Sequence, residues 1–160
     1  MTSQEDRIGA LEARLQKVED MLAIYQLLSA YGPAVDRGDA EATAALWVED
    51  GSYDWGGAIE EGCAGLKAMV KGERHQGIIA GGAGHVLSPP HITISGDRAT
   101  ALCYSRLYRR EGESYVLARL SANRWELMRT GLGWRVKSRI NRLLDGSPGA
   151  RALLEPPAAG

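Results

Sequence analysis

The stretch "YGPAVDRGDAEATAALWVEDGSYDW", residues 31–55, decides how the first half of the chain is organised. Pro33 lacks an amide hydrogen, so "GP" predicts the end of a preceding helix. Asp39 has the position of an N-cap for a second helix over residues 40–49. The closing "GSYDW" predicts a short strand. An acid, Asp36, is thereby left between two helices, with aromatic residues soon after it.

Upstream of this stretch, residues 4–31 predict one long helix. Thr2 and Glu5 have the spacing of a capping box at its start. Apolar residues recur at alternating steps of three and four, as in a coiled coil: Ile8, Leu11, Leu15, Val18, Leu22 and Tyr25. The core-facing stripe of an ordinary helix would look the same. The polar character of residues 1–18 favours a leading helix that packs on another subunit.

Downstream, the pattern changes from helices to strands. Residues 63–75 predict a third helix, between two segments, "GGAIEEG" and "GIIAGGAG", that predict loops. Four strands follow, with a tight turn "EGES" between the second and the third: residues 85–95, 99–110, 115–130 and 134–144. Residues 145–160, rich in Gly, Pro and Ala, predict an irregular tail. This order is typical of an α+β fold, here one domain over residues 1–160, with helices on one face of a curved antiparallel sheet.

The composition argues against several classes of protein. The 160 residues carry 19 basic and 20 acidic side chains, a formal net charge of -1, and no basic block, so a nucleic-acid partner is not expected. No apolar run approaches the length of a membrane span, and "MTSQEDRIGALEARLQ" lacks the apolar core of a signal peptide. Cys63 and Cys103 form no CxxC motif, so a reducing cytoplasmic setting is expected.

Three segments of the chain resemble one family. "LSAYGPAVDRGDAEATAALWVEDGSYDW", "GHVLSPPHITISGDRATALCY" and "LMRTGLGWRVKSRI" together look like the SnoaL-like group of the NTF2-like superfamily, over roughly residues 20–142. The resemblance implies a cone, in which N-terminal helices and a strongly curved, mostly antiparallel sheet enclose a pocket. The superfamily includes dehydratases, isomerases, cyclases and non-catalytic subunits, and dimers or trimers are common in it. A small-molecule ligand and a homo-oligomer are therefore expected.

The resemblance also carries over individual residues. Asp36 and His85 stand where the dehydratases and a dehydrochlorinase have a catalytic aspartate and histidine. Tyr31 matches a tyrosine that a bile-acid dehydratase has before its own aspartate. Arg142 falls one residue away from an arginine on the last strand of that enzyme. The second histidine of scytalone dehydratase has no counterpart here after residue 91.

Asp36 and His85 would make a coherent acid–base pair. An aspartate that accepts the imidazole N–H fixes the tautomer and leaves the other nitrogen as a base for proton abstraction. The helix dipole disfavours an acid at a helix C-terminus, which favours a functional role for Asp36 over a structural one. His85 could otherwise be an ordinary loop histidine. Tyr31 could be a core tyrosine, since five residues turn through about 140° around an ideal helix.

Four further residues are candidates for the pocket lining, although packing within the sheet would explain each of them: Tyr53, Trp55, Asn123 and Trp125. His75 and His91 lack partners at metal-ligand spacing, so no metal is expected. Neither glycine-rich segment has the pattern of a phosphate loop, and no cofactor is expected.

Two functions remain. One is a cofactor-free, dehydratase-like lyase or isomerase for a small, mainly apolar, polycyclic or aromatic substrate. The other is a non-catalytic ligand-binding or assembly subunit with the same fold.

Overall fold

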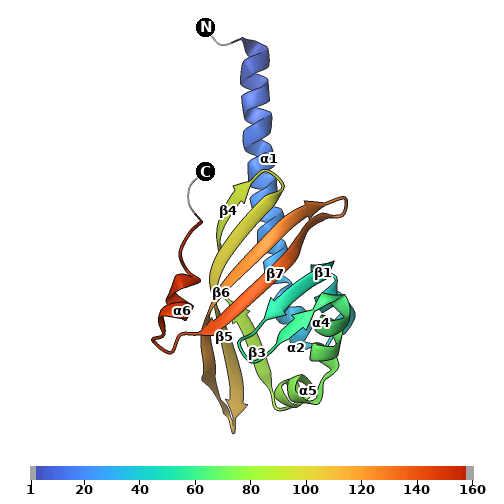
Figure 1. Cartoon of the computed structure of the whole chain (residues 1–160), viewed down its shortest axis with the longest axis vertical. Helices are drawn as coiled ribbons and strands as arrows, with labels where there is room; N and C mark the ends of the chain where they lie inside the picture. Colours follow the sequence, from blue (N-terminus) through green and yellow to red (C-terminus); the bar gives the residue numbers. More distant parts are fainter. Residues whose placement is uncertain (1–2, 158–160) are drawn as a thin grey trace.

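The computed structural model describes residues 3–157, which form one seven-stranded sheet with helices before it, between its second and third strands, and after it (Figure 1). The helices are α1 (Gln4–Ser29), α2 (Tyr31–Asp36), α3 (Ala40–Ala44), α4 (Gly62–Lys71), α5 (Glu73–Ala80) and α6 (Pro148–Ala152). The strands are β1 (Trp47–Asp54), β2 (Ile59–Glu61), β3 (Ala83–Leu87), β4 (His91–Ser95), β5 (Arg98–Glu111), β6 (Ser114–Thr130) and β7 (Gly133–Leu143).

The sheet is curved, open and mostly antiparallel. Its order is β2-β1-β7-β6-β5-β3, and β4 pairs separately with β5. β1 and β7 run parallel, whereas the other pairs described are antiparallel. The long hairpin of β5 and β6 forms its centre, as the pattern of two long strands around "EGES" predicted. The predicted α+β fold, with N-terminal helices on a curved sheet, is therefore confirmed.

The first helix projects well beyond the sheet (Figure 1). Ser3 and Asp6 form a capping box at its start: Ser3 Oγ accepts a hydrogen bond from the Asp6 amide, and Asp6 Oδ2 accepts one from the Ser3 amide. The predicted cap, Thr2, lies outside the described residues. Residues 4–19 are exposed throughout, so only the second half of α1 packs on the rest of the chain.

A polar cluster around Asp20 fastens α1 to the sheet. Asp20 is 6% exposed, and its carboxylate accepts two hydrogen bonds of 2.7 Å from Arg129 in β6. Trp134 in β7 donates a third, 2.9 Å long, from its indole nitrogen. The hydrogen bonds from Arg129 lower the pKa of Asp20 to about 2, so the carboxylate is ionised at neutral pH and the helix is held by charge-assisted bonds.

The helix break comes earlier than predicted. α1 ends at Ser29, and α2 begins at Tyr31. Pro33 lies in the first turn of α2, where a missing amide hydrogen is tolerated, so it does not end a helix here. The chain turns instead after Asp36, where Gly38 takes a positive φ of 71° that suits glycine. Asp36 therefore ends α2, and its side chain is free to reach across to the sheet.

The second helix has the predicted cap but not the predicted length. The Asp39 carboxylate accepts a hydrogen bond of 2.8 Å from the Ala42 amide, which confirms the N-cap. α3 ends at Ala44 rather than at residue 49. The reason is that Trp47 already pairs with β7 as the first residue of β1, which starts before the predicted strand.

Glycine and proline divide other predicted elements. Residues 63–75 belong to two helices, α4 and α5, which are separated at Gly72, and α5 continues to Ala80 through part of a predicted loop. The predicted strand 85–95 is two strands, β3 and β4, because two consecutive prolines lack the amide hydrogens that a ladder needs. The other predicted loop contains β2, and the predicted irregular tail contains α6.

The core lies between the helices and one face of the sheet, here called the inner face. Trp125 in β6 marks this face, and it is fully buried. The chain after α6 lies on the opposite face, where the Glu155 carbonyl accepts a hydrogen bond of 3.1 Å from Arg124. No helix within residues 3–157 combines the length and the apolar character that crossing a membrane requires.

Candidate active site

Asp36 at the end of α2 is held against His85 in β3. One carboxylate oxygen, Oδ1, lies 2.6 Å from His85 Nδ1. The other, Oδ2, accepts a hydrogen bond of 2.8 Å from the backbone amide of His85. The helix and the strand approach this closely because position 32 is a glycine: a methyl group there would collide with the His85 carbonyl oxygen.

This geometry determines which nitrogen of His85 is free for chemistry. An ionised carboxylate only accepts hydrogen bonds, so Nδ1 carries the hydrogen, and Nε2 is unprotonated when the ring is neutral. The side chains of His85 and Asp36 are 14% and 25% exposed, respectively. The pair therefore presents an oriented basic nitrogen in a largely shielded place, as a general base requires.

Two cavities meet at His85 on one side of β3. The outer cavity, of about 270 Å³, has apolar walls from Trp55, Met69 and Ile78 and polar groups at Glu60, Arg74 and His75. The inner cavity, of about 10 Å³, is lined by residues that include Ser105, Leu107 and Arg139. Both are lined by the same four residues: Tyr31, Tyr53, His85 and Arg119. The inner cavity is thus the deep end of the outer one.

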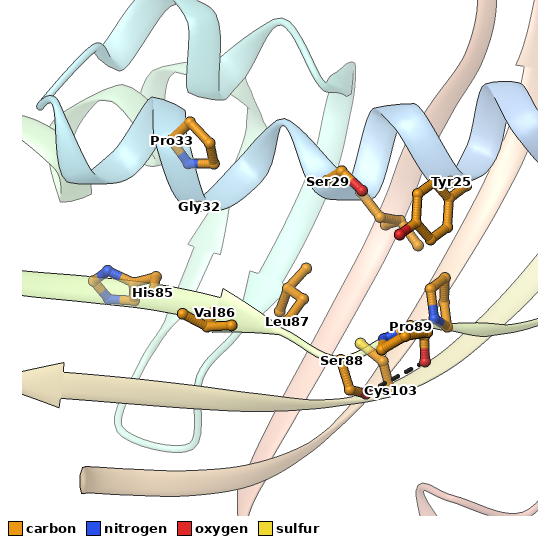
Figure 2. A pocket seen from close by; sticks show the side chains of 12 residues that line it. Tyr25, Ser29, Gly32, Pro33, His85, Val86, Leu87, Ser88, Pro89 and Cys103 are labelled. Atoms are coloured by element: carbon orange, nitrogen blue, oxygen red, sulfur yellow. Dashed lines mark hydrogen bonds between the residues drawn. The ribbon is translucent and has the colours of Figure 1, made fainter.

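A separate cleft of about 260 Å³ lies beside α1 and α2 (Figure 2). The His85 ring lies at one end of it, near Pro33, while Tyr25, Pro89 and Cys103 gather at the other end. No Asp, Glu, Lys or Arg of the described part of the chain lines this cleft. The charged side chains line the outer and inner cavities instead, which makes those two the better place for a reaction.

Tyr31 lies deep in the site. Its ring packs edge-on against Trp47, Tyr53 and Trp125, with centroids 6.0, 6.5 and 5.7 Å away. It is 4% exposed, yet it lines both cavities together with His85. Burial raises the pKa of the Tyr31 hydroxyl above its ordinary value of 10, so this group stays protonated and can donate a hydrogen bond at neutral pH.

The predicted pocket residues fall into two groups. Tyr53 lines both cavities, and Trp55 lines the outer one, where its indole nitrogen donates a hydrogen bond of 3.0 Å to Glu60. Trp125 and Asn123 are fully buried and line neither cavity. Trp125 is part of the aromatic core, and Asn123 lies behind the inner cavity as a hydrogen-bonding partner of Arg139. For these two, packing within the sheet is the correct interpretation.

The structure does not bring Arg142 to the site, and that prediction is corrected. Its two terminal nitrogens pair with the carboxylate of Asp54, at 2.8 and 2.6 Å. The hydrogen bond and the charge of each partner raise the pKa of Arg142 and lower that of Asp54. Arg142 lines neither the outer nor the inner cavity.

A β-bulge in β7 turns Arg142 away from the site. Side chains alternate between the two faces of a strand, so counting from the buried Val136 would turn Arg142 inward. Lys137 is an extra residue in the pairing of β7 with β6, and it shifts the alternation by one. Beyond the bulge, Arg139 and Asn141 are the buried residues.

Among the residues of the site that sequence reasoning missed are Arg139 and His75. Arg139 lines the inner cavity, but only the bulge reveals that it faces inward. His75 in α5 lies 2.8 Å from the Val35 carbonyl through Nε2, which must therefore donate, and its ring centroid is 5.7 Å from that of His85. No pattern in the sequence places His75 at the site, because the residues of α5 do not predict a helix separate from α4. Within residues 3–157, no group of three His, Cys or acidic side chains is arranged to hold a metal ion.

Comparison with known proteins agrees with this fold. The family model of the SnoaL-like domain matches residues 16–140, and the chain belongs to this family. An NTF2-like protein with a cystatin-like fold from Novosphingobium aromaticivorans is 44% identical, with a TM-score of 0.90 over 97% of this chain and 99% of that one. Among curated proteins, none matches the sequence.

More distant structures share the fold alone. Rv3472 of Mycobacterium tuberculosis, a protein of unknown function, is 22% identical over 86% of this chain and 79% of that one, with a TM-score of 0.74. A provisionally assigned scytalone dehydratase from Novosphingobium aromaticivorans is 20% identical over 79% of this chain and 85% of that one, with a TM-score of 0.67.

Proposed function

We propose that this protein is a cofactor-free lyase or isomerase, with dehydration as its reaction, and that its substrate is small, mainly apolar and ring-containing. The observation that carries the proposal is the hydrogen-bonded pair of Asp36 and His85, which leaves Nε2 of the imidazole as a free base where the two cavities meet.

The pair would catalyse an elimination as follows. His85 Nε2 takes a proton from a carbon next to a carbonyl group, and the electrons of the broken C–H bond move onto the carbonyl oxygen. They return to form a C=C bond as the C–O bond to a hydroxyl on the next carbon breaks. Protonated His85 then gives its proton to the departing hydroxyl, so water leaves and the imidazole is neutral again. Asp36 stabilises the imidazolium between these steps.

The outer cavity limits the size of the substrate. Its volume of about 270 Å³ lies just below the usual range for ligand pockets, about 300–1,000 Å³. Apolar walls at Trp55, Met69 and Ile78 suit a hydrocarbon ring, and neutral Tyr31 can donate a hydrogen bond to one of its oxygens. A compound of one or two rings with a few oxygens fits these features.

Elimination from a panel of cyclic β-hydroxy ketones tests the proposal, because the product is a conjugated enone that absorbs in the ultraviolet. We expect turnover by the wild type, and a loss of about 10²–10⁴ in rate for His85→Ala. Asp54→Asn is a matched control, since this acid pairs with Arg142 away from both cavities. Binding of these compounds without turnover by the wild type would favour the alternative, a non-catalytic ligand-binding subunit.

We also propose that the protein is a homo-oligomer, a dimer or trimer assembled through α1. The coiled-coil stripe is exposed along its whole length, by 42–61% per residue: Ile8, Leu11, Leu15, Val18, Leu22 and Tyr25. The buried residues of α1, Asp20, Ile24 and Leu28, are not part of this stripe. A second copy of α1 carries the matching stripe that would cover it.

The charges beside the stripe favour parallel helices. With Ile8, Leu15 and Leu22 at the a positions of the heptad, Arg7 and Arg14 take g positions, and Glu12 and Glu19 take e positions. In a parallel coiled coil each g residue faces the e residue of the next heptad of its partner, so Arg7 meets Glu12 and Arg14 meets Glu19. Antiparallel helices would bring like charges together.

Charge reversal tests this assembly. We expect Arg7→Glu with Arg14→Glu to weaken the oligomer, and mixing with a Glu12→Arg, Glu19→Arg variant to restore a complex of the two. Light scattering would measure both effects. A wild-type monomer at micromolar concentration would show that α1 does not assemble the protein.

We place the protein in a reducing compartment, the cytoplasm. Cys63 and Cys103 are both free thiols, and Cys103 is buried in the core. Free thiols of this kind are typical of reducing surroundings. Disulfide-linked protein in a non-reducing extract of the source cells would contradict this.

A further inference from the structure

Arg139 is a buried cation without a counter-ion. It is 2% exposed, and none of the salt bridges found within residues 3–157 includes it. Arg129 and Arg142, in contrast, each pair with a carboxylate. A buried unpaired charge is costly, and such groups concentrate at functional sites.

Neighbouring side chains hold the guanidinium in place but leave its charge uncompensated. Nε and Nη2 donate to Asn123 Oδ1, at 2.9 and 2.8 Å. Asn123 is itself oriented by a hydrogen bond of 2.8 Å from its amide nitrogen to Ser105. The rings of Tyr31, Tyr53 and Trp125 lie 4.2–4.4 Å from the guanidinium carbon, and their faces favour a cation. All these partners are neutral.

One nitrogen of Arg139 remains unused. Nη1 is buried and has no hydrogen-bond partner in the described part of the chain. Arg139 lines the inner cavity together with His85 and Tyr31. At about 10 Å³, this space holds one group of the size of a water molecule, so it admits a single oxygen atom and not a ring or a phosphate.

We propose that Arg139 binds one substrate oxygen that becomes negatively charged during the reaction, and hence that the substrate is a carbonyl compound that forms an enolate. The inference rests on the function proposed above. A ring in the outer cavity would extend its carbonyl oxygen into the inner cavity, and the carbon next to the carbonyl would lie near His85. When His85 takes the proton, the electron pair moves onto this oxygen. A fixed cation in a site that excludes water stabilises that charge strongly.

The ionisation of bound 2-naphthol tests this inference, because naphtholate resembles a ring-bound enolate and its absorption and fluorescence differ from those of the neutral form. We expect the wild type to bind the naphtholate preferentially. Arg139→Met, which keeps the length of the side chain but not its charge, should lower the bound naphtholate-to-naphthol ratio on the order of 10- to 100-fold, as expected for a lost hydrogen bond to a charged group. Arg142→Met is the matched control and should leave the ratio unchanged.

Two further measurements separate this inference from folding and from the proposed elimination. Arg139→Lys keeps the charge and should retain part of the preference, and a wild-type titration of the bound naphthol needs no variant at all. The preference should survive His85→Ala, which abolishes elimination. Wild-type protein that binds 2-naphthol only in its neutral form, or does not bind it, would overturn the role of Arg139, even if elimination is observed.

Discussion

Replacing Gly32 with alanine should disturb the site through the packing of α2 on β3. The new methyl group would fall far inside the roughly 3.5 Å at which non-bonded atoms make favourable contact, and the atom it meets is the backbone carbonyl oxygen of His85. Neither contacting group belongs to a side chain that could rotate aside, so α2 and β3 must separate by on the order of 1 Å. Overpacking of this kind costs about 1–3 kcal/mol of unfolding free energy.

The same separation should cost activity. The hydrogen bonds of 2.6 and 2.8 Å between Asp36 and His85 span the interface that opens, so the imidazole would lose its fixed orientation. A displacement of about 1 Å lowers the rate on the order of 10²-fold in well-aligned sites. We therefore expect Gly32→Ala to be both less stable and about 10²-fold slower in the elimination assay.

Gly9→Ala is the matched control. Gly9 also lies in a helix, but beyond its chain neighbours and the nearby helix backbone no atom lies within 4 Å of the place its methyl group would take. Helix propensity alone makes alanine more favourable than glycine by about 1 kcal/mol, so the two substitutions should change stability in opposite directions. Urea unfolding and elimination kinetics measure both effects. A Gly32→Ala protein as stable and as active as the Gly9→Ala protein would refute the idea that close packing at Gly32 aligns the pair.

Three more predictions concern the pair, the anchor of α1 and the assembly. Asp36→Asn, His85→Ala and the double variant should each lower elimination by a similar factor of about 10²–10⁴, because the two residues act as a unit; additive losses in kinetic measurements would contradict this. The pKa of Asp20 is lowered from 3.8 to about 2 in the folded protein, so its ionised carboxylate contributes about 2 kcal/mol to the unfolding free energy above pH 4. This contribution is lost as the pH falls toward 2. Urea unfolding between these pH values should therefore show a smaller change of unfolding free energy with pH for Asp20→Asn than for the wild type. Leu15→Glu, at an exposed a position of the stripe, should shift light-scattering mass toward the monomer, and an unchanged mass would exclude the stripe as the interface.

Local pattern was sufficient for much of the fold. The long strands around "EGES", the N-cap at Asp39 and the long first helix all follow from side-chain period and turn chemistry, which act over a few neighbouring residues. Several of the errors lie at glycine and proline. The prediction of a helix end at Pro33 is wrong because the first turn of a helix accepts proline, and the prediction of one helix over residues 63–75 is wrong because two helices meet at Gly72.

The candidate site shows the limit of such reasoning. The resemblance to a family pointed to Asp36 and His85, but the residues are 49 positions apart, and only the packing of α2 on β3 brings their side chains to 2.6 Å. The inward-facing arginine depended on a single extra residue: the bulge at Lys137 turns Arg139 toward the inner cavity and Arg142 away from it. Sequence alone determined the main elements, the long first helix and the central hairpin of β5 and β6, because propensity and period are local. Tertiary structure decided which side chains face the site, because bulges and register arise from pairing between distant strands.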